Sequence, residues 1–572
     1  MRTDPLTPAI MTRESVMARS PFPELALALG TQFVMIVLIT RLVGVHAWDD
    51  GAITLAYSRT FAESGLIALT SVSEVVEGYS STAWFLINAA MALFRPGFEG
   101  AIHASQMAAG LFLGVATVLV WLIARHLGLR PRTRLAILLV FSLFGPAVSE
   151  VSNGMEMTLL TATGLALFHA LYVRENRLLL AVAIVVFLTA RFEAMIYYAA
   201  LLTPLLLRGR YRSFILLAAA GMAVVGLHAI VRYSVFGDVF PNPVHAKMHV
   251  PYSLSGLQGV KLRLIAAVEI TATLFPMVLA VSALLIIPWS GLSGRLRALG
   301  SARNDVLALA APVAAVVLFA ILIGKNWGYV GRMQFLALPF VLLIFGLVYD
   351  RLADPARTVS ARPALVAVCA LTILFSWIVS ARQPIAQMAR TLSGGGGEVA
   401  EAYGTTPETY RRTGLAVDHL RRLLGRDIIT FATPDVGGLA LCCDRIRVVD
   451  LGLLASRKLA RQGYAALPAI LAEERPDAIE VHQHWGVNSK IYAIPEFRND
   501  YQPVVIDRTR FYLRNEHAEK LIGERRAQWC AVEEAACAAS ALRTHRYVNS
   551  VTKLDDAAFL ERKKVLMVGE VP

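Results

Sequence analysis

Long apolar runs alternate with short arginine-rich segments from residue 24 to about residue 381. About 20 apolar residues in a helix span a bilayer, and several of the runs approach this length. A polar stretch, 1–23, precedes the first run and predicts a cytoplasmic tail rather than a cleaved signal peptide. We expect eleven membrane-spanning helices, at 24–45, 101–124, 133–149, 156–173, 177–190, 192–207, 213–233, 264–287, 305–323, 333–349 and 363–381.

The apolar segment 81–94 leaves two interpretations, because it is short for a crossing. If it does not cross, five arginine-rich loops fall on the same side as the N-terminus, as the positive-inside rule requires. These loops are 124–134, 173–177, 207–212, 294–303 and 350–362. We therefore expect 81–94 to lie in the outer interface, within a first outer loop at 46–100, with a short true span as the alternative.

The remaining part, 382–572, has a different character. It opens with the flexible sequence SGGGGE at 393–398 and then becomes charged and mixed. Short buried strands are expected at 427–434, 445–451 and 477–482, and helical patterns such as 414–425 lie between them. This pattern predicts a soluble α/β domain outside the membrane.

Composition supports a membrane protein. The chain is 56% hydrophobic and 17% charged, whereas soluble domains carry about a quarter charged residues. The net charge of +13 does not indicate nucleic acid binding, because the arginines gather at the ends of apolar runs. The predicted fold class is a multi-pass α-helical membrane domain, 24–381, followed by a C-terminal periplasmic α/β domain, 382–572.

The cysteines suggest disulfides in the exported part. Four of the five lie in the tail, at Cys442, Cys443, Cys530 and Cys537, and Cys369 lies in a span, where packing explains it. We expect the 442/443 pair to be bonded to the 530/537 pair, with free buried thiols as the alternative.

Two adjacent carboxylates, Asp49 and Asp50, follow the first span directly. One aspartate would serve as a helix N-cap, which is the ordinary explanation. A pair at a membrane surface could also provide a general base with a shifted pKa. Holding a divalent cation through carboxylate oxygens is a third alternative.

Other polar residues fall at the predicted outer ends of the spans. Arg191 and Glu193 stand between two short spans, where charges indicate function by default or a mutual ion pair. Trp84 suits the interfacial aromatic belt or stacking on a sugar. His245 and His249 are spaced i, i+4, which is a weak metal pattern. Carboxylates in the first outer loop with cations in later ones predict group transfer from a lipid-borne phosphate.

The order of these motifs resembles membrane glycosyltransferases of the GT-C superfamily, and most closely bacterial terminal arabinofuranosyltransferases. The segment 49–91 is similar to their first outer loop, with its Asp-Asp, arginine-containing helix and Glu-Gly-Tyr. The later motifs are similar in the same order: NGMEM at 153–157, ARFEA at 190–194, 233–247, GRMQFLALPF at 331–340 and 433–454. The likeness covers most of residues 40–485.

The resemblance implies roles for residues of this chain. Asp49 is the expected catalytic base and Asp50 its partner, or a metal or acceptor ligand. Contacts to the donor phosphate are expected from Arg191, Lys247, Arg332 and His245. Contacts to the acceptor or the sugar are expected from Arg59, Glu77, Tyr79, Trp84, Glu156 and Trp327.

Together these features predict an inverting glycosyltransferase of the bacterial inner membrane with a periplasmic active site. The resemblance implies a decaprenyl or undecaprenyl phosphate sugar as donor, arabinofuranose as one candidate sugar, and a cell-envelope glycan or lipid-linked acceptor. No cofactor is required with certainty, and a divalent cation stays open. A monomer in contact with membrane lipid is expected. A lipid or glycan flippase is the alternative function, and a non-catalytic anchor for a binding domain is a further one.

Overall fold

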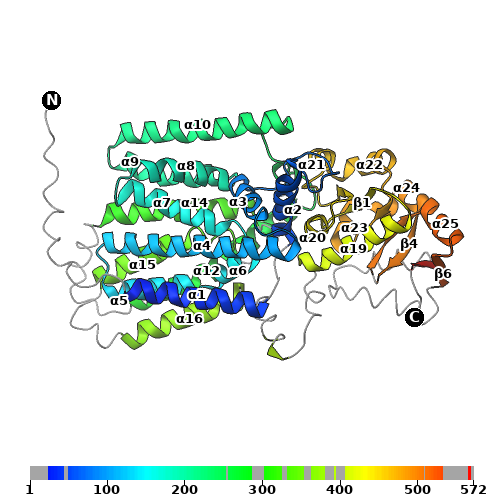
Figure 1. The fold of residues 1–572 in the computed structure, drawn as a ribbon. Coiled ribbons are helices and arrows are strands. Elements are labelled where there is room, and N and C mark those ends of the chain that lie inside the picture. The colour runs from blue at the N-terminus through cyan, green and yellow to red at the C-terminus, as the bar shows by residue number, and fades with distance from the viewer. Residues whose placement is uncertain are drawn as a thin grey trace.

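The computed structural model describes residues 23–43, 49–252, 256–285, 302–324, 331–352, 362–380, 389, 392–393, 406–507, 509–531 and 564–568. Within these ranges the chain forms a bundle of long helices and a domain built on a sheet (Figure 1). The two parts meet at one end of the bundle. Helices α2 (Asp49–Ser64) and α20 (Gly437–Cys442) lie at this junction (Figure 1).

Each apolar range expected from the sequence overlaps a helix, or a pair of helices, in the bundle. The bounds are α1 (Pro23–Val43), α4 (Phe98–His126), α5 (Pro131–Leu143), α6 (Gly145–Asn153), α7 (Met157–Tyr172), α8 (Arg177–Ala190), α9 (Ala194–Leu207), α10 (Tyr211–Phe236), α12 (Gly256–Leu285), α14 (Arg303–Ile323), α15 (Leu338–Leu352) and α16 (Arg362–Ser380).

The number of clear spans is smaller than predicted. Among the described residues, α4, α10 and α14 are long and apolar enough to cross a membrane, and α5 with α6 would add a fourth although they meet at 43°. Helices α8 and α9 have 14 residues each, which is about 21 Å and less than the ~30 Å hydrocarbon core. The structure therefore shows three or four clear apolar spans, not eleven.

Helix α10 shows why the bundle needs an apolar surrounding. Ile215, Leu216, Met222, Leu227 and Ile230 are all more than 60% exposed on it. An exposed apolar surface of this kind is unfavourable in water and favourable in lipid. The helix thus presents a lipid-facing side at the edge of the bundle (Figure 1).

The first outer loop contains α2 and α3 (Thr82–Ala92). Helix α3 is capped by Ser81, whose hydroxyl accepts a hydrogen bond from the backbone N–H of Trp84 at 3.2 Å. Its 11 residues extend about 16 Å, too short for a crossing. An interfacial position for this helix remains a prediction.

The tail folds around a seven-stranded sheet in the order β2-β1-β3-β5-β4-β7-β6. Strands β1, β2 and β3 are parallel and confirm the three strands expected from the sequence. The strands are β1 (Ile429–Thr433), β2 (Ile446–Asp450), β3 (Ala478–Ile479), β4 (Tyr501–Ile506), β5 (Thr509–Arg514), β6 (Ala527–Ala531) and β7 (Lys564–Val568). The helices are α19 (Pro407–Leu423), α20, α21 (Arg457–Gln462), α22 (Leu467–Glu474), α23 (Gln483–Ser489), α24 (Pro495–Asp500) and α25 (Asn515–Gly523).

The tail and the first outer loop share one hydrophobic core. Ala52 and Tyr57 of α2 belong to the same buried cluster as Leu439 and Ala440 of α20. Hydrogen bonds surround this cluster: Asp444 accepts the backbone N–H of Ser71 at 2.7 Å. The packing fixes α2 against the tail, so the tail helps to place the residues at the start of α2.

The expected pairing of cysteines is wrong. Cys442 and Cys443 are bonded to each other, at the end of α20, so neither can reach the 530/537 pair. Cys530 is disulfide-bonded. Cys537 and the side chain of Cys369 lie outside the described residues.

Candidate functional site

The two carboxylates at the start of α2 point into different surroundings. Asp49 is 7% exposed, and its two oxygens accept the backbone N–H groups of Gly437 at 2.9 Å and Gly438 at 2.7 Å. The side chain of Asp50 is 43% exposed and lies 3.7 Å from the guanidinium of Arg332. The two aspartates therefore have different neighbours: Asp49 contacts the tail, and Asp50 faces an open cavity.

A network of buried charged side chains lines the cavity that Asp50 faces. Arg191 follows the end of α8 and pairs with Glu156 and Glu193. Glu156 precedes α7 and also accepts a hydrogen bond from Arg332 at 2.9 Å. The ion-pair alternative for Arg191 and Glu193 is therefore confirmed, and a functional role for the two residues remains a prediction.

The polar cavity brings together six of the residues expected to act on substrate. It has a volume of about 90 Å³ and lies between α2, the turn before α7 and the loop that follows α11 (Asn242–Ala246). Asp50, Glu156, Arg191, Lys247 and Arg332 line it, and Tyr79 forms part of its wall. It combines one open carboxylate with three cationic side chains.

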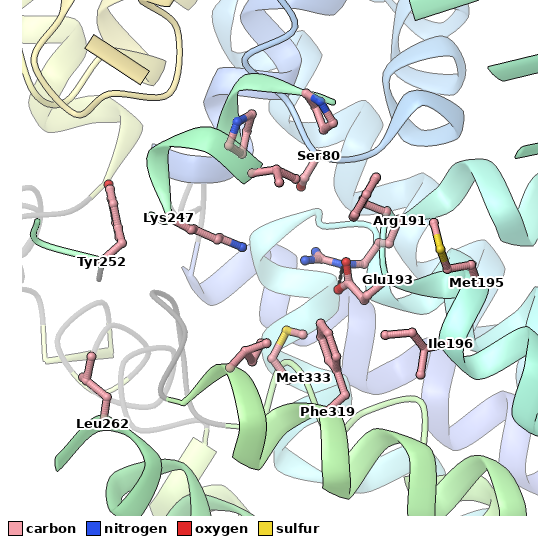
Figure 2. Close-up of a pocket in the computed structure, with 15 residues that line it drawn as sticks. Ser80, Arg191, Glu193, Met195, Ile196, Lys247, Tyr252, Leu262, Phe319 and Met333 are labelled. Carbon is pink, nitrogen blue, oxygen red and sulfur yellow. Dashed lines mark hydrogen bonds and ion pairs between the residues drawn. The ribbon is translucent and has the colours of Figure 1, made fainter. Parts of the chain in front are cut away.

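A larger apolar cavity of about 290 Å³ adjoins the polar one. Both are lined by Ser80, Arg191, Pro243, Lys247 and Tyr252. Figure 2 shows Lys247 extending toward Arg191 and Glu193, with apolar side chains beyond them. The apolar wall is formed by Phe192, Met195, Ile196, Val244, Leu262, Phe319, Ile323 and Met333. We call the two cavities together the cleft.

The aromatic residue Tyr79 lines the polar cavity with its ring stacked on Phe85 at 4.6 Å. Trp84, in contrast, is buried and donates its indole N–H to the backbone oxygen of Gly154 at 3.2 Å. Trp84 therefore packs α3 against the turn before α7 and does not line the cleft. Trp327 lies outside the described residues.

Three further residues expected at the site lie elsewhere. Arg59 donates to the backbone oxygen of Leu441 at 2.7 Å, at the junction with the tail, because this face of α2 is covered by α20. Glu77 accepts hydrogen bonds from Nε and Nη2 of Arg232, at 2.8 and 3.0 Å. His245 is 3.0 Å from Asp238 and does not line the cleft.

The surroundings shift the titration of the two aspartates. Burial raises the pKa of Asp49 well above its ordinary value, as does the negative charge of Asp435, while the N–H groups of Gly437 and Gly438 oppose this. Burial also raises the pKa of Asp50, and the positive charge of Arg332 lowers it. Asp50 is thus an open carboxylate whose pKa lies above the ordinary value of an aspartate.

Sequence reasoning missed Ser80, Tyr252 and Asp435. Tyr252 lines both cavities, and its hydroxyl donates to the backbone oxygen of Gly452 at 3.1 Å, so it connects the cleft to the tail. Asp435 follows β1 and lies 3.1 Å from His482. The signal for Asp435 was its position at the carboxyl edge of parallel strands, where ligand sites gather.

The donors at α2 do not fit a bound metal ion. Both oxygens of Asp49 are occupied by backbone N–H groups, and Asp50 faces the cation of Arg332. In the part of the chain that the structure describes, no group of three or more His, Cys, Asp or Glu side chains is arranged to hold a metal. The same holds for the His245 and His249 pattern, since His249 is bonded to the backbone oxygen of Arg461.

Comparison with known proteins gives structural neighbours only. No family model and no curated protein sequence matches the chain. The structure is similar to ArnT from Cupriavidus metallidurans in the apo state, with a TM-score of 0.51 at 9% identity, over 86% of this chain and 98% of that chain. The chain shares the fold of ArnT.

Two other solved structures are more distant. The oligosaccharyltransferase of Archaeoglobus fulgidus in the apo form gives a TM-score of 0.46 at 11% identity, over 84% of this chain and 73% of that chain. ArnT from C. metallidurans bound to undecaprenyl phosphate gives 0.42 at 14% identity, over 78% and 79%. ArnT and the oligosaccharyltransferase are GT-C glycosyltransferases.

Proposed function

We propose that the chain is a glycosyltransferase that moves a sugar from a polyprenyl phosphate donor to a glycan or lipid-linked acceptor. The observation that carries the proposal is the cleft, in which an open carboxylate and three cations adjoin a larger apolar cavity. A polyprenyl phosphate sugar has the matching chemistry, because its phosphate lies between a polar sugar and an apolar prenyl chain. The shared GT-C fold supports the same conclusion.

The cations are suited to the donor phosphate. Arg191 and Arg332 are held in place by Glu156, so their guanidinium groups are oriented before any ligand arrives. Lys247 extends into the cleft where the polar and apolar cavities join (Figure 2). The prenyl chain would lie along Phe192, Ile196 and Phe319, which line the apolar cavity.

The proposed reaction is a direct displacement with inversion. The acceptor oxygen forms a bond to the anomeric carbon while the bond from that carbon to the phosphate oxygen breaks. The electron pair leaves with the polyprenyl phosphate, whose added charge is stabilised by Arg191, Lys247 and Arg332. Asp50 takes the proton of the acceptor hydroxyl. In this scheme Asp50 has the role that the sequence resemblance assigns to Asp49.

Several finer features belong to the proposal. We propose that the bundle places the cleft at the periplasmic face of a bacterial inner membrane, with the N-terminus cytoplasmic and the tail periplasmic. The shorter helices would add further crossings where the bilayer is locally thinned. Decaprenyl or undecaprenyl phosphate carries the sugar, arabinofuranose is the favoured sugar, and an envelope glycan is the acceptor.

The test uses the purified full-length protein in detergent. Undecaprenyl phosphate serves as the binding probe, and radiolabelled decaprenyl-phosphoryl arabinose serves as the donor with envelope glycan as acceptor. Asp50→Asn should bind undecaprenyl phosphate like the wild type and transfer at least about 100-fold more slowly. Glu74→Gln, on the same loop but outside the cleft, is the control and should behave as the wild type.

Two results would contradict the proposal. One is transfer by Asp50→Asn at the wild-type rate. The other is a wild-type protein that does not bind undecaprenyl phosphate and transfers no sugar from lipid-linked pentoses or hexoses.

A further inference from the structure

The carboxylate of Asp49 is the point at which the tail contacts the start of α2. Both of its oxygens accept backbone N–H groups at the start of α20, from Gly437 and Gly438. It is the residue directly before Asp50 and belongs to the first turn of the same helix. A change in the placement of Asp49 is therefore passed directly to Asp50 through the backbone.

The contact is close enough to require glycine on the tail side. A Cβ atom at Gly437 would lie 2.3 Å from the backbone oxygen of Asp49 and 2.8 Å from its carboxylate. Real Cβ atoms do not approach other atoms this closely, so any side chain here would push the start of α2 away. The φ angle of Gly437 is not positive, so its backbone conformation does not require glycine. The requirement comes from the close approach of α20 to the start of α2.

The far end of α20 is attached to α2 separately. Arg59 donates to the backbone oxygen of Leu441, and Asp444 lies 3.5 Å from Arg59. Ten residues of helix separate Asp49 from Arg59, which is about 15 Å. The two ends of the junction can therefore be disturbed independently of each other.

The placement of Asp50 matters because its partner is at the limit of an ion pair. The carboxylate of Asp50 and the guanidinium of Arg332 are 3.7 Å apart. A shift of about 1 Å would change both its electrostatic environment and its distance to an acceptor hydroxyl.

We propose that Asp49 is a positioning residue, through which α20 of the tail holds Asp50 toward Arg332 and the polar cavity. The tail is then part of the catalytic apparatus without touching the reacting atoms. The kinetic side of this inference rests on the proposed function, whereas the placement of Asp50 can be measured without any transfer.

The experiment compares Gly437→Ala with Gly414→Ala in the full-length protein. The first substitution displaces Asp49 while its charge stays. The second is a matched control. A Cβ atom at Gly414 would lie 2.7 Å from Sγ of Cys442 and 3.2 Å from Cα of Leu439. Cys442 and Leu439 both belong to α20 and lie away from Asp49. Both substitutions therefore crowd the same helix, and only one crowds the proposed contact.

The direct readout is coupling of glycine ethyl ester to Asp50 by a carbodiimide, measured by peptide mass spectrometry as a function of pH. Carbodiimides react with the protonated carboxyl group, so the midpoint reports the titration of Asp50. A larger distance between Asp50 and the positive charge of Arg332 should move this midpoint up by about one pH unit in Gly437→Ala. In Gly414→Ala the midpoint should equal that of the wild type.

The kinetic readout is transfer from the lipid-linked donor. Gly437→Ala should lower kcat about tenfold or more and leave KM for the donor within about twofold, because the phosphate contacts are unchanged. If Gly437→Ala does not fold, Asp49→Asn provides the same test. Its amide keeps one acceptor oxygen and places an N–H group against a backbone donor, so kcat should again fall about tenfold.

The outcomes separate the two proposals. A wild-type midpoint and kcat in Gly437→Ala, or equal shifts in Gly414→Ala, would overturn the positioning role. An unchanged kcat in Asp49→Asn would do the same. If the protein transfers no sugar but the midpoint shifts only in Gly437→Ala, the positioning stands and the proposed function fails.

Discussion

The two sides of α2 differ in how their polar groups are used. On the side that faces the tail, both oxygens of Asp49 accept backbone N–H groups of α20, and Arg59 donates to the backbone oxygen of Leu441. On the side that faces the cleft, Asp50 is 43% exposed and has one cation at 3.7 Å. Asp49 and Asp50 are adjacent in the sequence, but Asp49 belongs to a closed junction and Asp50 to an open site.

The difference shows what distinguishes a structural carboxylate from a reactive one. A carboxylate whose oxygens are both occupied by N–H donors cannot take a proton from a substrate without losing those bonds. A carboxylate that is open to a cavity and has a raised pKa can. Substitutions on the cleft side should therefore change the chemical step directly, whereas those on the tail side should change stability or act on catalysis only through the placement of Asp50.

The largest effect is expected at Asp50. Asp50→Asn removes the proposed proton acceptor and should lower kcat by about 10²–10⁴-fold with little change in the thermal midpoint. Transfer assays and thermal unfolding of the solubilised protein measure the two quantities. A wild-type kcat would show that the open side of α2 is not the catalytic one.

A smaller loss is expected at Lys247, where the cleft changes from polar to apolar. Lys247→Met keeps the length of the side chain and removes its charge, so the Kd for undecaprenyl phosphate should rise about tenfold. The control is Lys458→Met, because Lys458 lies at the surface of the tail and pairs with Glu473 at 2.7 Å. Equal affinities of the two variants would place the phosphate away from Lys247.

The apolar cavity should distinguish donors by chain length. Ile196→Asn places an amide on its wall and should weaken binding of undecaprenyl phosphate about threefold to tenfold, because an amide is unfavourable against a prenyl chain. Binding of a two-isoprene phosphate that does not reach this wall should change less. A uniform loss for both ligands would contradict the assignment of this cavity to the chain.

The pH profile gives a further contrast. The proposed base works only when it is deprotonated, so activity should rise with pH through the pKa of Asp50. Burial raises that pKa, and therefore the acid limb of kcat should lie above the ordinary pKa of an aspartate. A profile that stays flat down to the ordinary value would remove Asp50 from the proton transfer.

The smallest effect is expected on the tail side, at Asp444. This residue accepts a hydrogen bond from Ser71 and is partly exposed. Asp444→Asn should cost about 1 kcal/mol of stability, seen as a lower thermal midpoint, and leave kcat/KM within about twofold. A large loss of activity at unchanged stability would mean that both sides of α2 take part in catalysis.

The sequence allowed much of the architecture to be predicted, because hydrophobic periodicity depends on local pattern. The ranges of the bundle helices and strands β1 to β3 follow from runs of apolar residues and their breaks. The number of clear crossings was overestimated, because short apolar helices such as α8 resemble spans in composition and differ in length. The pairing of cysteines depended on tertiary proximity that spacing does not contain.

The site was predicted less evenly. Arg191 could be selected because a charge between two short apolar runs is unfavourable unless it has a role, whereas Lys247 and Arg332 were selected through the resemblance. The different roles of Asp49 and Asp50 could not be predicted, since they depend on Gly437, which lies nearly 390 residues later in the chain. Trp84 is an aromatic residue in the expected place whose indole instead bonds to Gly154.

The most direct test of the cleft is a structure of the full-length protein with undecaprenyl phosphate bound. We predict the phosphate within hydrogen-bonding distance of Lys247 and of Arg191 or Arg332, the prenyl chain along Ile196 and Phe319, and Asp50 one sugar ring away from the phosphate. A phosphate bound outside the cleft, or separated from Asp50 by more than about two sugar rings, would contradict the account.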